Sequence, residues 1–520
     1  MSSGLFRSGM VISAMTMVSR ILGLVRDMVV ARYFEVNGAT DAFFVAFRIP
    51  NLLRRFFAEG AFSLAFVPVL SEYRKTRSSE ALRDLIDHVA GMLGLVLLLV
   101  SIGGMLAAPW LIDVIATGFA HKEGARPELA AELLRIMFPY ILFISLAGLA
   151  GGILNTFKHF AAPAFAPALL NVILIIAVIW VAPYFDEPLK ALAWGVFVAG
   201  IAQIAVQLPA LRQLGLVPRF RFRRRHEGVG RIMKLMGPAL FGSSVAQINL
   251  IINTNIASFL AVGSNSWLYY SDRFVELPLA IFGVALGTVI LPKLSGDHAQ
   301  ADTGAFRHTL DWALRLALLI AIPATVGLVM LAEPILASVM MYGEFRWSDV
   351  QMSALSLMTY ALGLPAFILV KVLAPGFYAR QDTKTPVRIG IIAIFANMGL
   401  NLVIVLPWFL SGASGAHAGL ALATALAGFV NAGLLYLTLR REGMFDPRSG
   451  WSKHLLRIMA GCIVLALALA LLMPTDAWWQ SASALTRMAW LGLLIVVAVV
   501  SYFVTLRLTG LSWRQMLGRR

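Results

Sequence analysis

Charged side chains inside long apolar segments are the residues of this 520-residue chain that could do chemistry. An arginine, lysine or aspartate at the centre of a membrane-spanning helix costs about 2.5–3.5 kcal/mol on insertion scales, so such a residue usually serves a polar cavity. Arginine can also donate two parallel hydrogen bonds to a phosphate group. Several arginines at this depth therefore predict that an anionic substrate is bound within the membrane and carried across it.

These polar residues gather in three segments. They are Ser19, Arg20, Arg26 and Asp27 in the first, Asp41, Arg48, Asn51, Arg54 and Glu59 in the second, and Asp272, Arg273 and Glu276 in a later one. Arg20 is too central in its segment to reach a membrane surface. The other groups also fit simpler roles. Arg26 and Asp27 could be a pair that reaches the membrane surface. In the second segment, Glu59 could form an ion pair with an arginine and Asp41 could cap the helix, and the third segment could be a self-neutralised cluster at the interface.

The segments that must position these residues are membrane spans. The chain is 59% hydrophobic and 13% charged, whereas soluble domains are about 25% charged. Apolar stretches near 20 residues long predict an all-α polytopic membrane protein of fourteen spans. Their expected limits are 8–32, 41–72, 86–113, 129–156, 163–184, 189–211, 232–262, 266–292, 309–340, 351–378, 387–410, 416–439, 454–473 and 487–509.

The net charge of +16 would suggest nucleic acid in a soluble protein. Here the basic residues concentrate in the short loops on one side of the predicted spans, which is the positive-inside pattern. This predicts a membrane protein that binds no nucleic acid and has both termini in the cytoplasm. The basic stretch at 218–228 fits contact with anionic lipid headgroups or plain positive-inside charge.

Two halves of the chain resemble each other. Residues 47–71 and 274–295 both carry an early proline, a central glycine and a Pro-x-Leu-Ser ending. Six spans per half give the halves the same orientation, with a substrate path between them. The expected parts are an N-terminal lobe at 1–214, a basic cytoplasmic loop at 215–231, a C-terminal lobe at 232–441, and two extra spans without buried charge and a tail at 442–520.

Motifs of other chemistries are missing from the sequence. We find no nucleotide-binding loop, no HExxH and no GxSxG pattern. The one cysteine, Cys462, can form no disulfide within the chain. The sequence therefore predicts a transporter rather than an enzyme, with no catalytic residue, no cofactor and no metal.

Three stretches resemble the MurJ/MviN family of bacterial lipid II flippases. They are SRILGLVRD (19–27), TDAFFVAFRIPNLLRRFFAEGAFSLAFVPVLSEY (40–73) and YSDRFVELP (270–278). The resemblance implies two six-helix lobes in a V, with the last two helices forming a groove for a polyprenyl tail. It implies that the cargo is the undecaprenyl-diphosphate-linked disaccharide-pentapeptide, in the bacterial inner membrane. The family's important arginines fall on Arg20, Arg26, Arg54 and Arg273. Membrane lipids and cell-wall synthesis proteins are further expected partners.

One departure from the family concerns ion coupling. Some members have acidic residues, associated with sodium, where this chain offers Asn253, Asn397 and Asn401. Hard cations prefer carboxylate oxygen, so these amides predict at most a weak cation site, and membrane potential is the expected bias. Two alternatives remain: a multidrug/cation antiporter of the same superfamily, which needs an acidic cavity, and a non-transporting scaffold for cell-wall synthesis.

Overall fold

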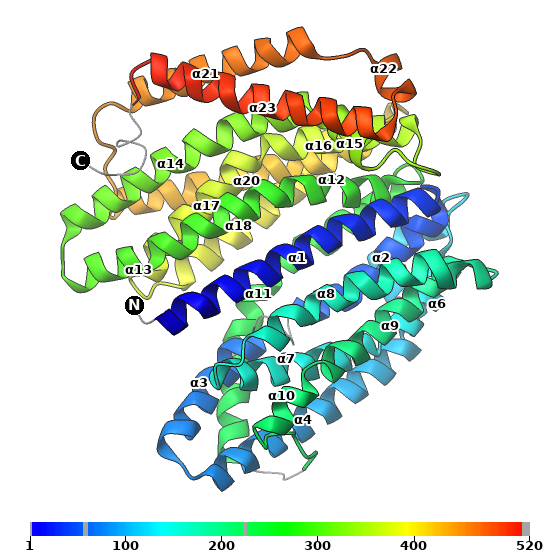
Figure 1. Cartoon of the computed structure of the whole chain (residues 1–520), viewed down its shortest axis with the longest axis vertical. Helices are drawn as coiled ribbons and strands as arrows, with labels where there is room; N and C mark the ends of the chain where they lie inside the picture. The colour runs from blue at the N-terminus through cyan, green and yellow to red at the C-terminus, as the bar shows by residue number, and fades with distance from the viewer. Residues whose placement is uncertain (1–2, 56–60, 222–225, 512–520) are drawn as a thin grey trace. The chain divides into compact units, whose positions relative to one another are not determined.

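The computed structural model describes residues 3–55, 61–221 and 226–511. These residues form helices joined by short connections, and no strand occurs among them (Figure 1). The predicted all-α class is therefore confirmed. The helices divide into two compact units, Met1–Asn265 and Ser266–Arg520.

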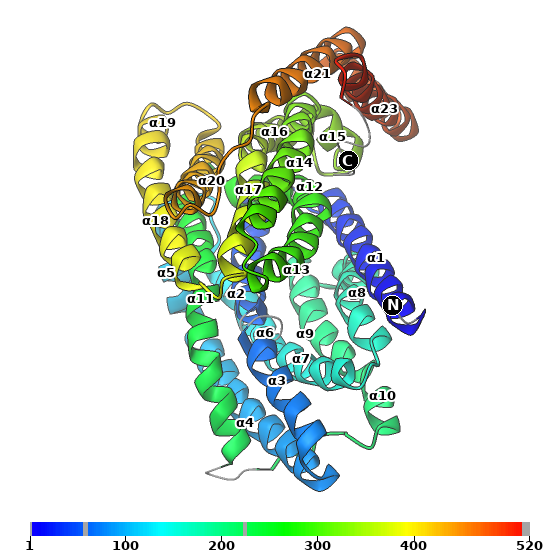
Figure 2. The ribbon, with the colours of Figure 1, turned by 90° about the vertical axis from the view of Figure 1, so that its left-hand side faces the viewer.

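The first unit holds the helices that carry most of the candidate residues. They are α1 (Ser3–Tyr33), α2 (Gly38–Arg54), α3 (Ala61–Thr76), α4 (Ser79–Leu106), α5 (Ala108–Ile115), α6 (Pro127–Met137), α7 (Tyr140–Thr156), α8 (Ala161–Ile176), α9 (Leu189–Ala205), α10 (Leu208–Gln213) and α11 (Glu227–Phe259). Figure 1 shows α1 lying along α8. Figure 2 shows α4 and α11 side by side.

The second unit begins within α12. Its helices are α12 (Ser264–Pro278), α13 (Ala285–Ala299), α14 (Thr303–Met330), α15 (Ala332–Val339), α16 (Trp347–Leu362), α17 (Leu364–Tyr378), α18 (Lys384–Leu400), α19 (Leu406–Leu410), α20 (Ala416–Arg441), α21 (Trp451–Leu472), α22 (Asp476–Ser481) and α23 (Ala484–Leu508). α21 and α23, the predicted extra spans, pack on each other (Figure 1).

Eleven helical segments among the described residues are long and apolar enough to cross a membrane. They match eleven of the predicted spans, so the polytopic membrane fold is confirmed. The other three predicted spans correspond to α1, to α2 with α3, and to α11. The total of fourteen stays a prediction.

The division into units differs from the expected lobe limits. Helix α11, which we expected to open the C-terminal lobe at 232, falls in the first unit because it packs on α3 and on the short helix η2 (Thr117–His121). The lobe limits at 214 and 232 therefore stay a prediction.

The internal repeat has a counterpart in helix geometry. α8 ends in the π-helical turn η3 (Ala177–Val181), and α18 ends in the π-helical turn η6 (Asn401–Val405). α7 and α8 both pack on α9 in the first unit, and α17 and α18 both pack on α20 in the second. Such turns are rare and concentrate at functional sites. Each turn comes shortly after a buried asparagine, Asn171 on α8 and Asn397 on α18.

Candidate functional site

Arg26 and Asp27 form a buried polar centre between α1 and α8. Arg26 is 6% exposed and Asp27 is 2% exposed. The Arg26 guanidinium donates from Nε and Nη2 to Asp27 Oδ1 at 3.0 and 2.6 Å, and from Nη1 to Asn171 Oδ1 at 3.0 Å. Because both side chains are buried by protein, they do not form a pair that reaches out to the membrane surface.

Asn171 also binds α1 two turns earlier. Its Nδ2 donates to the backbone carbonyl of Ser19 at 3.0 Å. Gly23 lies between these two contacts, and a methyl group there would meet the Asn171 amide at 3.6 Å. The amide therefore holds α1 at two points and fixes the rotation of the helix that carries Arg20 and Arg26.

Arg20 differs from Arg26 in both exposure and bonding. Its side chain is exposed, and no hydrogen bond or ion pair joins it to another residue in the part of the chain that the structure describes. An uncompensated guanidinium in a predicted span is available to an anion.

Arg54, at the end of α2, is half-buried and binds the preceding turn. It donates from Nε and Nη2 to Asn51 Oδ1 at 3.2 and 2.9 Å. Glu59, the expected partner of Arg54 or Arg55, lies outside the described residues. Asn51 is a neutral acceptor, so this contact positions the Arg54 guanidinium.

Asp41 does not cap α2. The cap is Asn37, whose side chain accepts from the amides of Ala39 and Thr40 in a capping box. Asp41 is 2% exposed and accepts a 2.8 Å hydrogen bond from the backbone N–H of Gly263. The interpretation of Asp41 as a helix cap is therefore wrong, because Asn37 already binds the free backbone amides at the start of α2.

Further contacts within the first unit join the end of α11 to η2 and to the end of α5. The backbone N–H of Gly118 donates to Ser258 Oγ at 2.9 Å, and Asn255 Nδ2 donates to the carbonyl of Val114 at 2.8 Å. A methyl group on Gly118 would lie 2.5 Å from the α11 backbone. Beside this cluster, burial lowers the pKa of the Lys122 ammonium, and the negative charge of Asp41 opposes that shift.

Arg48 lies at the edge of an apolar cavity. Its guanidinium donates to the hydroxyl of Thr254 on α11. The cavity measures about 210 Å³, and its walls include Leu52, Phe138 and Leu250. Arg48 thus supports the contact between α2 and α11 within the first unit.

Arg273 belongs to the second unit and binds residues of its own helix. It donates to the hydroxyl of Tyr269 at 2.7 Å and pairs with Glu276 at 3.3 Å. Its guanidinium also lies 4.7 Å from the centre of the Tyr269 ring. The three side chains form a ladder along one face of α12, while Asp272 is exposed. The expected charge cluster is present, and the sequence analysis did not include Tyr269 in it.

The asparagines of the suggested cation site are buried. Asn401 Nδ2 donates to Asn397 Oδ1 at 3.1 Å, and Asn397 Nδ2 lies 3.4 Å from the hydroxyl of Thr424. Asn253 is also buried but belongs to the first unit. The two amides of the second unit are brought together, and a weak cation site there stays a prediction.

The sequence analysis missed a polar junction on α14. Asp311 is 4% exposed, pairs with Arg315 at 2.8 Å and accepts from Trp451 Nε1 at 2.8 Å. Arg315 also donates to the carbonyls of residues 448 and 449. Asp311 and Arg315 lie four residues apart within a predicted span, and that spacing is the signal that could have found them. A cavity of about 340 Å³ beside this junction is lined by Arg315, Lys453 and Arg457.

The expectation that the last two spans lack buried charge is wrong. Arg487, at the start of α23, is 6% exposed. It donates to the carbonyls of Ala337 and Met341 at 3.0 and 3.2 Å and lies 5.1 Å from the centre of the Tyr342 ring. Arg487 stands at the first residue of the predicted span 487–509, where sequence cannot show that another helix covers it.

Known proteins resemble the whole chain. A sequence model of the family described as lipid II flippase MurJ matches residues 30–493. A lipid II flippase MurJ of Burkholderia cenocepacia is 43% identical over 514 residues, which are 98% of each chain. A probable lipid II flippase MurJ of Vibrio cholerae is 44% identical over 524 residues, covering 99% of this chain and 98% of that one.

Solved structures agree with the sequence comparisons. A lipid II flippase MurJ in an inward closed conformation is 28% identical, with a TM-score of 0.81, and covers 98% of this chain and 100% of its own. An inward-facing multidrug transporter of the MATE family is 15% identical, with a TM-score of 0.65, and covers 84% and 98%. That second likeness shows a shared fold alone. From the sequence match and the relatives' identity along the full length, this chain belongs to the lipid II flippase MurJ family.

Proposed function

We propose that this chain moves lipid II from the inner to the outer leaflet of the bacterial cytoplasmic membrane by alternating access. The family match supports the cargo, and the arginines at Arg20, Arg26, Arg54 and Arg273 supply the chemistry that a diphosphate needs. The observation that carries the proposal is Arg20, an exposed guanidinium in a predicted span with no partner among the described residues.

The other three arginines are held in place by local partners. Arg26 has Asp27 and Asn171, Arg54 has Asn51, and Arg273 has Tyr269 and Glu276. Side chains positioned in advance lose little conformational freedom when a ligand arrives. A diphosphate, with more negative charge than one carboxylate, can compete for such donors. Arg20 makes the first contact in this scheme, and the partnered arginines follow.

Alternating access requires contacts that can open without unfolding a helix. The first unit offers such contacts at both ends of α11: Asp41 with Gly263 and Ser258 with Gly118 at one end, and Arg231 with Glu72 at the other. Each hydrogen bond contributes a net of only about 0.5–1.5 kcal/mol. In this proposal the two sets of contacts open in turn, so that the substrate path faces one leaflet at a time.

The polyprenyl tail stays in lipid, along α21 and α23. These helices present large apolar side chains outward, including Leu456, Leu471, Leu485 and Leu508, which are 68–84% exposed. Covering such side chains with an isoprenoid chain costs little, because lipid and isoprene are similarly apolar. Only the charged headgroup then has to pass through protein.

Both termini are cytoplasmic in this proposal, as the basic loops indicate. Membrane potential acting on the charged cavity biases the cycle, at about 2.3 kcal/mol per charge per 100 mV. Asn397 and Asn401 hold a cation only weakly. Membrane lipids and cell-wall synthesis proteins are the partners of the working protein.

Reconstitution tests the proposal. Purified protein is placed in vesicles with fluorescent lipid II, and an impermeant quencher reports the fraction in the outer leaflet. Matched vesicles carry a fluorescent phosphatidylcholine, which lacks the diphosphate. We expect faster exchange of lipid II than in protein-free vesicles and no acceleration of phosphatidylcholine. Lipid II exchange at the protein-free rate would refute transport, and equal acceleration of both lipids would refute recognition of the diphosphate.

A further inference from the structure

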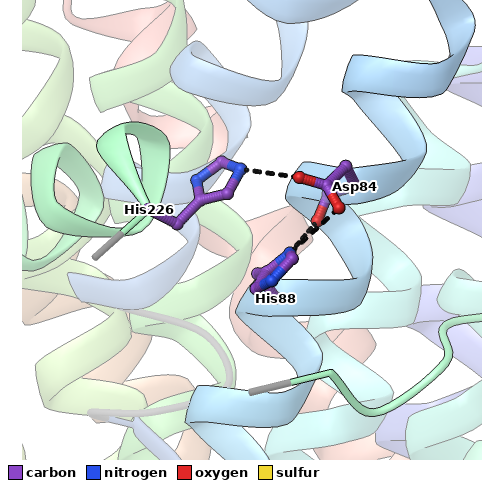
Figure 3. Close-up of side chains that lie close together, drawn as sticks. All are labelled: Asp84, His88 and His226. Atoms are coloured by element: carbon purple, nitrogen blue, oxygen red, sulfur yellow. Dashed lines mark hydrogen bonds and ion pairs between the residues drawn. The ribbon is translucent and has the colours of Figure 1, made fainter. Parts of the chain in front are cut away.

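Two histidines and an aspartate meet where the basic loop joins α11. Asp84 and His88 lie one turn apart on α4, and His226 stands directly before α11 (Figure 3). One ring nitrogen of each histidine and one carboxylate oxygen of Asp84 lie within 4.8 Å of one another. The sequence could not show this cluster, because His226 is distant along the chain from the other two residues.

The separations match those of ligands around one metal ion. His88 Nδ1 lies 3.3 Å from Asp84 Oδ1, and His226 Nε2 lies 3.4 Å from Asp84 Oδ2. Zinc bonds of about 2.0–2.1 Å in tetrahedral geometry place neighbouring ligand atoms about 3.3 Å apart. The two imidazole rings also lie close together, with centres 5.0 Å apart and planes inclined by 27°. All three groups are therefore within reach of one ion.

The burial of the three side chains suits an ion that enters from solvent. The side chains of His88 and His226 are 9% and 12% exposed, while that of Asp84 is 38% exposed. The histidines are therefore held by the protein, and the carboxylate leaves an open side for the ion and a bound water. Two imidazoles and one carboxylate with an open fourth position are a donor set that zinc accepts.

The present hydrogen bonds must change when the ion binds. His88 Nδ1 lies 2.8 Å from the backbone carbonyl of Asp84, so binding through this nitrogen exchanges that contact for a metal bond and leaves the ring proton on Nε2. His226 Nδ1 accepts from the amides of Gly228 and Val229. Binding through His226 Nε2 moves the ring proton to Nδ1 and exchanges this helix cap for a metal bond.

Positive charge nearby sets the expected strength of binding. Arg221 lies 3.8 Å from Asp84 and 3.8 Å from Asp87, and its side chain is 55% exposed. The backbone amides of residues 219 and 221 also bind Asp87. An exposed guanidinium weakens a metal site but does not fill it. We therefore expect binding weaker than that of a structural zinc site.

From this geometry we propose that Asp84, His88 and His226 bind a divalent transition-metal ion, with zinc as the best fit, and that the ion ties the end of the basic loop to α4. Both elements belong to the first unit. The ion would then stabilise the contact of the first turn of α11 with α4, where Gly228 already packs on Leu85.

The test measures metal bound to the full-length protein in detergent. The protein is stripped with chelator, dialysed against Zn²⁺ and analysed for retained zinc, and Co²⁺ absorption reports the geometry. Variants are His88→Gln and His226→Asn, since asparagine also caps helices well and removes only the imidazole. His308→Gln, at an exposed histidine on α14, is the matched control.

We expect about one zinc per chain and a tetrahedral cobalt spectrum, both lost in the two variants and kept in the control. The melting temperature without metal should be the same for His226→Asn and the parent, which shows that the variant is folded. No retained metal in the parent would show a hydrogen-bonded cluster only and overturn the proposal. Retention that survives both variants would place the ion elsewhere, with the same consequence.

Discussion

Arg26 on α1 donates a 3.0 Å hydrogen bond to Asn171 on α8, two residues separated by 145 positions in the sequence. Both side chains are buried, and the same guanidinium pairs with Asp27. The bond joins the arginine-bearing helix to the helix that ends in the π-helical turn η3. It therefore couples the orientation of a proposed substrate ligand to the packing of the first unit.

Asn171→Ala should destabilise the protein, because it leaves a buried guanidinium donor and the carbonyl of Ser19 without this partner. The expected loss is about 1–3 kcal/mol in the free energy of unfolding, measured by denaturation in detergent. Asn431→Ala is the control, because Asn431 Oδ1 has no hydrogen-bond partner among the described residues. Equal effects of the two substitutions would contradict the role of Asn171.

Ser258→Ala should loosen the contact between η2 and α11. The amide of Gly118 loses its acceptor, so hydrogen exchange at this amide should become about 2- to 10-fold faster, the equivalent of one ordinary hydrogen bond. Mass spectrometry of the peptide spanning residues 114–121 measures the rate. Ser101→Ala, at a buried hydroxyl of the first unit without a partner in the described chain, should leave this rate unchanged.

The ion pair between Arg126 and Glu187 should make stability depend on pH. The hydrogen bond from Arg126 lowers the pKa of Glu187 below its ordinary value of 4.5. The paired carboxylate therefore contributes stability above about pH 4.5, and this contribution is lost as the pH falls through the lowered pKa. Both side chains are partly exposed, so the coupling is about 0.2–1 kcal/mol.

A double-mutant cycle of Glu187→Gln and Arg126→Gln measures this coupling. The coupling energy should be positive at neutral pH and should vanish in acid. A coupling that stays constant as the pH falls below the carboxylate's pKa would rule out the ionised pair as its source.

Asp311→Ala should release the segment that leads into α21. Asp311 accepts from Trp451 and pairs with Arg315, which in turn holds the carbonyls of residues 448 and 449. Limited proteolysis should cut residues 442–450 faster in the variant, with a loss of about 1–3 kcal/mol in stability. Asp446→Ala is the control on the same segment, at an exposed aspartate. Cleavage at the same rate in both variants would contradict the junction.

The helices could be predicted because apolar runs near 20 residues leave little choice of structure in a membrane. The charge clusters of α1 and α12 could also be found, since adjacent residues are close in space and residues three or four positions apart share a helix face, whatever the tertiary fold. The pair of Arg26 with Asp27 and the pair of Arg273 with Glu276 are of this kind.

Contacts between distant segments could not be predicted in this way. Asn171 was visible as a polar residue in a span, but its partner depends on which helix packs beside α8. Asp41 looked like a cap because it stands near a helix start, whereas its oxygen binds the backbone of Gly263. Every residue except proline has a backbone N–H, so a sequence does not show which one a side chain binds. The burial of Arg487 and the cluster around His226 could not be predicted either, because both depend on segments distant in the sequence.

The central claim is that arginines in the spans bind the anionic cargo, and Arg20 tests it most directly. Transport of lipid II in vesicles is compared for Arg20→Ala, Arg20→Lys and Arg32→Ala, the last at an exposed arginine in the final turn of the same helix. Melting temperatures should match, since Arg20 has no partner to lose within the described residues. We predict that Arg20→Ala loses transport, Arg20→Lys keeps part of it and Arg32→Ala keeps it all. Full transport by a folded Arg20→Ala protein would contradict the account.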